Sequence, residues 1–201
     1  MTDPKVNSIL DEGNRLFLQG KFQQAIIHYD KILDEDPKNI SCLNNKGYSL
    51  SKLKDFTNAM KCYNLALEIC PDDLSVLINK ISSFRKQGNL IESLSICDNI
   101  LKNNSNYNIA LYHKERILFS MNKFDESSSC CNRILEDYPD NGEVLFDKAS
   151  NFVMLSNFDD ALNSLEHSIS QGIQYKIKAK NSKSFKNLSN NIRFQNLISY
   201  L

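Results

Sequence analysis

The chain has 201 residues, and its 24 basic and 24 acidic side chains balance at neutral pH. An apolar fraction of 41% is ordinary for a folded protein, so the composition excludes a disordered chain and a nucleic-acid-binding polycation. The length suits one domain of common size or a short stack of repeats. The balance hides an asymmetry, because no acid follows Glu166: residues 167–201 carry a formal charge of +6 and residues 1–166 carry −6.

The first residues, MTDPKVNSILDEG, lack the basic end and apolar run of a secretory signal. No uncharged apolar stretch approaches the roughly 20 residues that span a bilayer. We therefore expect a soluble, cytoplasmic protein that makes no membrane contact. The six cysteines form no C-x-x-C pair and have no histidine at zinc-finger spacing. In a reducing compartment they are expected to act as small apolar packing residues.

A 34-residue period runs through the chain in five frames without an insertion. The fourth position of every frame is aliphatic, and the twentieth is always Ala or Ser. The frames begin at Val6, Ile40, Leu74, Asn108 and Gly142. Position seven is lysine in the last four frames, at Lys46, Lys80, Lys114 and Lys148. Such a lysine can lay its stem along a neighbouring helix with its ammonium in solvent, so we interpret the series as part of the repeat rather than a binding site.

Each frame contains two apolar series with helical spacing, at positions 4, 8, 11 and 12 and at positions 17, 20, 21, 24, 27 and 28. A polar break, such as QGK at 19–21, separates them and predicts two antiparallel helices joined by a tight turn. The second helix is expected to end before Pro37, Pro71 or Pro139, because proline cannot continue a helix. The next helix is expected to begin behind one of the polar caps Asn39, Asp72 or Asp73, Asn106, and Asp140 or Asn141.

The period stops after Gly172. The remaining segment predicts one or two further helices with apolar residues at Phe185, Leu188, Ile192, Phe194, Leu197, Ile198 and Leu201. A stack of repeats needs its last pair covered, so we interpret this segment as a solvating cap. The predicted organisation is a repeat array over residues 1–173 and basic capping helices over residues 174–201.

Paired helices need a small residue where they approach most closely. Gly13 and Gly47 on the first helices are predicted to face Ala25 and Ala59 on the second helices. With these small, aromatic and proline positions, residues 6 to about 173 resemble the tetratricopeptide repeat family, and especially small microbial proteins built only of such repeats. The resemblance implies an all-α, right-handed α-solenoid of five helix pairs whose first helices line a concave groove for a peptide or a partner helix.

Frame four departs from the family pattern. Glu115 stands at the small first-helix position, and the run SSSCC at 127–131 is poor in strong helix formers. We expect this frame to be the least stable local unit.

The family's groove-facing positions imply a set of partner-binding residues on the first helices. They are Asn14, Asn45, Tyr48, Asn79, Arg85, Tyr112, His113, Arg116, Phe119 and Phe146. Asparagine amides can bond an extended peptide backbone, and aromatic residues beside an arginine resemble an interaction hot spot. For Phe119 and Phe146, packing against the cap or the next helix is an equal alternative. Binding of chaperone tails is rejected, because Leu10, Ser75 and Asn79 stand where that clamp needs basic residues.

No phosphate-binding glycine loop occurs, and the three histidines lie in different frames without ligand neighbours. We predict no catalytic, cofactor or metal site, and hence no enzyme. The leading hypothesis is a non-enzymatic scaffold or adaptor that binds a protein or peptide partner in its groove. In one alternative, the protein is a regulatory or assembly subunit whose basic C-terminal segment contacts an acidic partner or nucleic acid. Of these two partners, nucleic acid is the less expected. Another alternative is self-association, with a monomer or weak homo-oligomer as the expected state.

Overall fold

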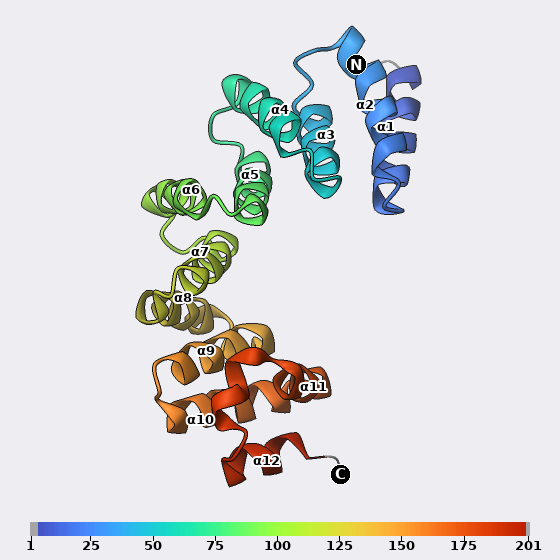
Figure 1. The fold of residues 1–201 in the computed structure, drawn as a ribbon. Helices are drawn as coiled ribbons and strands as arrows, with labels where there is room; N and C mark the ends of the chain where they lie inside the picture. Colours follow the sequence, from blue (N-terminus) through green and yellow to red (C-terminus); the bar gives the residue numbers. More distant parts are fainter. Residues whose placement is uncertain (1–3, 200–201) are drawn as a thin grey trace. The chain divides into compact units, whose positions relative to one another are not determined.

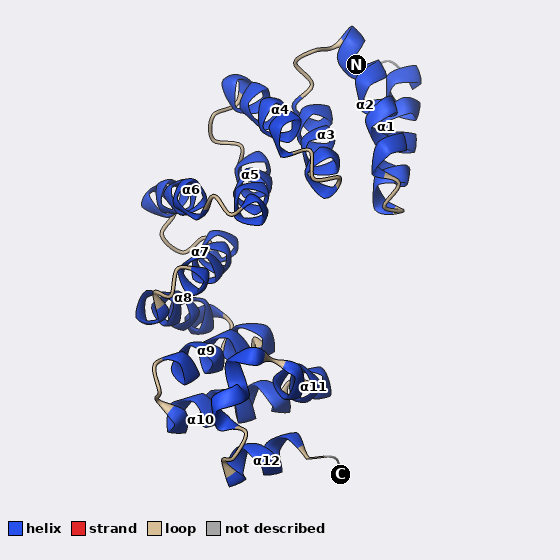
Figure 2. Cartoon of the chain, viewed as in Figure 1, coloured by secondary structure: helices blue, strands red, loops and turns tan. Residues whose placement is uncertain are grey.

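The computed structural model describes residues 4–199, with side chains described from residue 8 onward. Leu201 of the predicted cap and the side chain of Val6 lie outside these limits. Throughout the described part every regular element is helical (Figure 2). None of the helices described is both long and apolar enough to cross a membrane.

The chain forms two compact units, Met1–Ile96 and Cys97–Leu201. The first unit contains α1 (Pro4–Leu18), α2 (Phe22–Glu35), α3 (Ile40–Lys52), α4 (Phe56–Ile69), α5 (Leu74–Gln87) and the start of α6 (Leu90–Asn103). Within it, each helix from α1 to α5 packs on the next, and the first helices α1, α3 and α5 also contact one another in turn (Figure 1).

The second unit contains the end of α6, two complete helix pairs and the C-terminal segment. Its elements are α7 (Asn108–Ser120), α8 (Phe124–Asp137), α9 (Gly142–Met154), α10 (Phe158–Ser170), α11 (Ile173–Asn181), the 3₁₀ helix η1 (Lys183–Leu188) and α12 (Ile192–Ile198). Helices α3, α5, α7 and α9 begin at the residues that open the predicted frames. The all-α repeat fold predicted from the sequence is therefore confirmed.

Helix ends follow the local chemistry of the sequence. Asn39, Asp73 and Asn141 each accept a hydrogen bond from the backbone N–H three residues later, at 3.0–3.2 Å, and so cap α3, α5 and α9. The sequence left two caps open between adjacent residues, and the structure has Asp73 rather than Asp72 and Asn141 rather than Asp140 in these roles. The predicted cap at Asn106 is wrong, because α7 has Tyr107 at its N-cap without any side-chain hydrogen bond.

Three lysines of the 34-residue series, Lys46, Lys80 and Lys114, join adjacent repeats. Lys46 pairs with Asp30, and Lys114 Nζ lies 2.6 Å from Asp98 Oδ1. Lys80 Nζ donates to the Asn64 side chain at 2.7 Å. Each partner stands at position 25 of the preceding frame. Exposed pairs of this kind contribute about 0–1 kcal/mol each. Because the three ammonium groups bond side chains of the preceding frame, we interpret these lysines as part of the contact between repeats.

The turn inside each pair adopts a left-handed backbone at position fifteen of every frame. Gly20 and Gly88 have φ of 75° and 87°, and Lys54, Asn122 and Ser156 have φ between 60° and 66°. Glycine adopts this conformation without strain, whereas a residue with a Cβ atom does so at a cost. The turn geometry is thus common to all five frames, although only two frames have glycine there.

We expect Lys54→Gly to raise the free energy of unfolding by up to about 1 kcal/mol, because it removes this strain. Gly88→Ala should lower it by a similar amount for the opposite reason. Urea unfolding monitored by circular dichroism measures both, and a loss of stability in Lys54→Gly would contradict the strain argument.

The close approach of the paired helices depends on glycine facing tyrosine. A Cβ atom added to Gly47 would lie 2.7 Å from Tyr63 Cε1, and one added to Gly13 would lie 3.1 Å from Tyr29 Cε1. Both tyrosines are completely buried. The ring sixteen residues later thus fills the space that a side chain at position eight would need. The alanines predicted to face the glycines, Ala25 and Ala59, are buried in the same two clusters.

The packing predicts that Gly47→Ala destabilises the protein by about 2 kcal/mol, although helix propensity alone would favour alanine by about 1 kcal/mol. The matched rescue is Gly47→Ala with Tyr63→Leu, because Ala149 and Leu165 occupy the same two positions in frame five. Urea unfolding should show partial recovery in the double variant. Additive losses from the two substitutions would contradict the proposed contact.

The segment after α10 packs on the last helix pair. Ala179, Phe185, Leu188 and Phe194 are buried in one cluster with residues of α9 and α10. Lys178 Nζ lies 2.8 Å from Glu143, and Arg193 lies 2.6 Å from Glu166. The segment therefore makes both apolar and ionic contacts with the pair, while the domain boundary near residue 173 stays a prediction.

Candidate functional site

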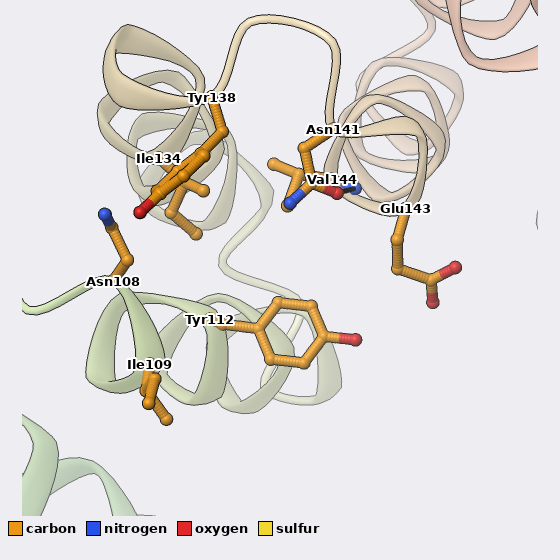
Figure 3. Close-up of a pocket in the computed structure, with 8 residues that line it drawn as sticks. All are labelled: Asn108, Ile109, Tyr112, Ile134, Tyr138, Asn141, Glu143 and Val144. Carbon is orange, nitrogen blue, oxygen red and sulfur yellow. Dashed lines mark hydrogen bonds between the residues drawn. The ribbon is translucent and has the colours of Figure 1, made fainter. Parts of the chain in front are cut away.

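A pocket of about 470 Å³ opens in the second unit, where α7 begins, α8 ends and α9 begins. We call it the α7–α9 pocket. Its walls come from three elements that lie around one opening (Figure 3). The lining residues are Asn108, Ile109, Tyr112, Ile134, Tyr138, Asn141, Glu143 and Val144.

The turn between α8 and α9 forms one side of the pocket. Tyr138 follows the last residue of α8, and its N–H donates to the Ile134 carbonyl at 3.0 Å. Pro139 prevents continuation of the helix, and Asn141 then caps α9 by accepting from Val144 N at 3.2 Å. On the other side, Asn108 Nδ2 donates to Asp137 Oδ2 at 2.9 Å and joins the start of α7 to the end of α8.

The pocket offers exposed apolar surface. The Ile109 side chain is 50% exposed and Tyr138 is 56% exposed. Figure 3 shows Tyr112 on α7 below Val144 of α9, with the Glu143 carboxylate near its hydroxyl end. An apolar cavity with a few polar groups at its edge is the common form of a ligand-binding site.

An ion network adjoins the pocket through Tyr112 and Glu143. Arg116 donates to Glu143 at 2.6 Å and to Asp147 at 3.1 Å, and Lys178 donates to the same Glu143 oxygen at 2.8 Å. The Arg116 guanidinium carbon lies 4.4 Å from the centre of the Tyr112 ring, a cation–π contact. Arg116 is thus already bonded to two carboxylates of α9 and packed on the ring of Tyr112.

Burial affects the titration of these groups. Burial alone would raise the pKa of Glu143, but the hydrogen bond and charge of Lys178, followed by those of Arg116, hold it below its usual range. Burial raises the pKa of Tyr112 to about 12, so its hydroxyl remains a hydrogen-bond donor at neutral pH.

Next to this network, Glu115 is a buried carboxyl group. It is 3% exposed, and its Oε1 accepts a hydrogen bond of 3.1 Å from Ser127 Oγ. Burial first, and then the negative charge of Asp147, raise the pKa of Glu115 to about 8. Burial also raises the pKa of Asp147 itself. At neutral pH the folded unit therefore holds a proton on Glu115.

This proton makes stability depend on pH. The folded pKa of Glu115 exceeds the ordinary value of 4.5, so the wild-type protein loses stability as pH rises from 4.5 toward about 8. Glu115→Gln imitates the neutral acid and should gain at least about 1 kcal/mol relative to wild type between pH 5 and pH 8.

Urea unfolding at the two pH values measures this gain. Glu136→Gln is the matched control, because it removes an exposed acid from the adjacent helix α8. Equal pH profiles for wild type and Glu115→Gln would contradict a protonated Glu115.

The predicted groove residues of the first unit include asparagines that bond one another. Asn45 Nδ2 donates to Asn14 Oδ1 at 3.0 Å, and the same oxygen accepts from Tyr29 Oη at 3.0 Å. Asn79 Nδ2 donates to Asn44 Oδ1 at 2.9 Å. The amides link α1 to α3 and α3 to α5, so only part of their bonding capacity remains for a partner.

Tyr48 and Arg85 complete the predicted set in the first unit. The Tyr48 ring lies 5.1 Å from that of Phe17, and Lys52 and Lys86 lie 5.2 Å and 5.9 Å from its centre. Arg85 is half-buried. These residues form no part of the α7–α9 pocket.

In the second unit, the predicted residues have different environments. Tyr112 lines the pocket, whereas His113 is half-buried with its ring 6.3 Å from that of Tyr112. Phe119 is half-buried and packs edge-on against Phe124, with the ring centres 5.3 Å apart.

Phe146 takes the internal one of the two placements that the sequence left open. It is only 3% exposed, because Phe185, Tyr175 and Lys178 of the C-terminal segment cover it. A partner therefore cannot reach this ring while the segment is in place.

The sequence reasoning missed Ile134 and Tyr138, because it searched the first helices alone. Ile134 lies in the last turn of a second helix, and Tyr138 directly follows that helix and is largely exposed. The signal that could have identified this side of the pocket is Tyr138 itself. A large aromatic residue directly before Pro139 stands at a helix end, outside the repeated apolar positions of the frame.

The repeated helix pairs define an α-helical repeat protein, in which neighbouring pairs within each unit pack on one another. The model of the tetratricopeptide repeat family matches residues 40–73, which is one full frame. Frame two thus matches the tetratricopeptide repeat family, and the frames around it form helix pairs of similar length.

Solved structures share this fold at low identity. MamA has a TM-score of 0.70 and 16% identity, and the alignment covers 88% of this chain and 96% of that one. A double mutant of MamA RS-1 has a TM-score of 0.75 and 11% identity, with coverages of 91% and 100%. YrrB, described as a tetratricopeptide repeat protein with an unusual peptide-binding site, has a TM-score of 0.67 and 17% identity, with coverages of 87% and 91%.

Proposed function

We propose that the chain is a non-enzymatic scaffold that binds a peptide or helix of a partner protein, with the α7–α9 pocket as the main contact. The observation that carries the proposal is this pocket of about 470 Å³, whose rim exposes Tyr138 and Ile109. Proteins of this repeat fold commonly bind protein partners, and the peptide-binding site described for YrrB agrees with that role.

The chemistry of the pocket suits an apolar side chain of the partner. Ile134 and Val144 supply apolar wall, while Asn108 and Asn141 supply polar groups at the edge. Tyrosine at such a rim gives apolar area and a hydrogen-bonding hydroxyl at low entropic cost, which is why tyrosine is frequent in interaction hot spots. The bound side chain would lie against Tyr138 and Ile134.

The first unit supplies a secondary contact in this proposal. Asn45 and Asn79 each donate one amide hydrogen to a neighbouring asparagine, so a second amide hydrogen of each is available for a peptide carbonyl. Tyr48 and Arg85 belong to the same predicted surface. Contacts at this surface would add affinity without depending on the amino-acid sequence of the bound peptide.

Affinity capture from a lysate followed by mass spectrometry tests the pocket. Ile109→Asp and Tyr138→Ala change exposed side chains, so both should fold, and each should weaken capture of the partner about tenfold or more. Ile173→Asp is the matched control, since Ile173 is 68% exposed and also lies in the first turn of a helix. Partners captured equally by wild type and both pocket variants would contradict the proposed site.

A further inference from the structure

A second cavity lies within the C-terminal segment, separate from the α7–α9 pocket and sharing no residue with it. It is an open pocket of about 360 Å³ that is lined by residues from the end of α11, from η1 and from α12. Its lining residues are Ala179, Lys180, Asn181, Ser182, Lys183, Phe185, Lys186, Ser189, Phe194 and Ile198. We call it the lysine pocket.

The charge around the lysine pocket has one sign. Three lysines line it, and no acid is among the lining residues. Lys178 and Arg193 of the same segment pair with acids of α9 and α10. Across residues 4–199, by contrast, neither Lys183 nor Lys186 makes an ion pair. Lys178 and Arg193, which dock the segment, are therefore different from Lys183 and Lys186, and two like charges beside a pocket without a lining acid favour an anionic ligand.

The interior of the lysine pocket is apolar. The rings of Phe185 and Phe194 stack with centres 5.8 Å apart and planes at 5°, and both are almost fully buried. Ile198 is partly exposed at the opening. The pocket thus combines an apolar wall with a cationic rim, and its volume is close to that of a small ligand site.

We propose that the lysine pocket binds an acidic peptide segment, with a carboxylate between Lys183 and Lys186 and an adjacent apolar side chain against Ile198. Nucleic acid fits the geometry less well. Single-stranded nucleic acid is held by an extended basic groove with exposed aromatic faces on which bases stack. Both rings here are buried, and the lysines line a single pocket of about 360 Å³. The site is independent of the partner-binding role assigned to the α7–α9 pocket.

A tryptophan-containing peptide tests the proposal directly, because the protein itself has no tryptophan. The probe is the pentapeptide Gly-Ser-Asp-Glu-Trp with a free carboxylate, titrated with full-length protein while its fluorescence is followed. We expect saturable binding. The double variant Lys183→Glu and Lys186→Glu should weaken it about tenfold or more. Lys183→Gln with Lys186→Gln, which removes the two charges without reversing them, should also weaken it, to a smaller extent.

The matched control is Lys31→Glu with Lys176→Glu, which makes the same change of net charge on exposed or half-exposed lysines outside the pocket. It should retain affinity within about twofold. Equal loss in the control and pocket variants would overturn the proposal, since the attraction would then follow overall charge.

Two further probes separate the ligand classes. The amidated peptide with Asn and Gln in place of Asp and Glu should bind about tenfold more weakly, and equal binding would overturn the role of the lysines. An oligothymidine of similar net charge should bind more weakly than the acidic peptide. If it bound more tightly, with a steep loss on added salt, the site would be a nucleic-acid contact and the proposal would be wrong.

Discussion

The fold depends on how closely the two helices of each pair can approach, and position eight of the first helix sets that distance. In frames one and two this position is glycine, and the ring of Tyr29 or Tyr63 occupies the space where its side chain would be. Position 24 supplies the complementary volume in each case. Positions 8 and 24 together thus fill the space between the two helices with different pairs of residues. The pair is glycine and tyrosine in frames one and two, and Ala149 and Leu165 in frame five.

Frame four uses the same position for a polar residue, and this connects the fold to the candidate site. Glu115 enters the core at position eight, next to Asp147, whose charge contributes to its raised pKa. Asp147 in turn binds Arg116, and Arg116 lies on the ring of Tyr112 at the edge of the α7–α9 pocket. The residue that breaks the repeat pattern is therefore linked to the surface proposed to bind a partner through two intervening residues, Asp147 and Arg116. A buried acid costs stability, and such a cost is tolerated more often near functional surfaces than elsewhere.

Much of the fold was predictable from the sequence, because a 34-residue period fixes helix starts at Ile40, Leu74, Asn108 and Gly142 without reference to distant contacts. Caps such as Asn39 were predictable for the same local reason. The candidate functional site was less predictable than the fold. Tyr112 was found from its place on a first helix, but Tyr138 was missed because its exposure results from the turn that follows it. Phe146 was left open between two placements because only packing of the C-terminal segment decides which one it takes.

Chemical-shift mapping can show whether a partner binds at the junction of α7, α8 and α9. Isotope-labelled protein would be titrated with a peptide from the partner that affinity capture recovers, and the backbone amide shifts would be followed by NMR. We predict that the largest shifts occur at Asn108, Tyr112, Tyr138 and Val144. Shifts confined to the first unit, with these amides unchanged at saturation, would contradict it.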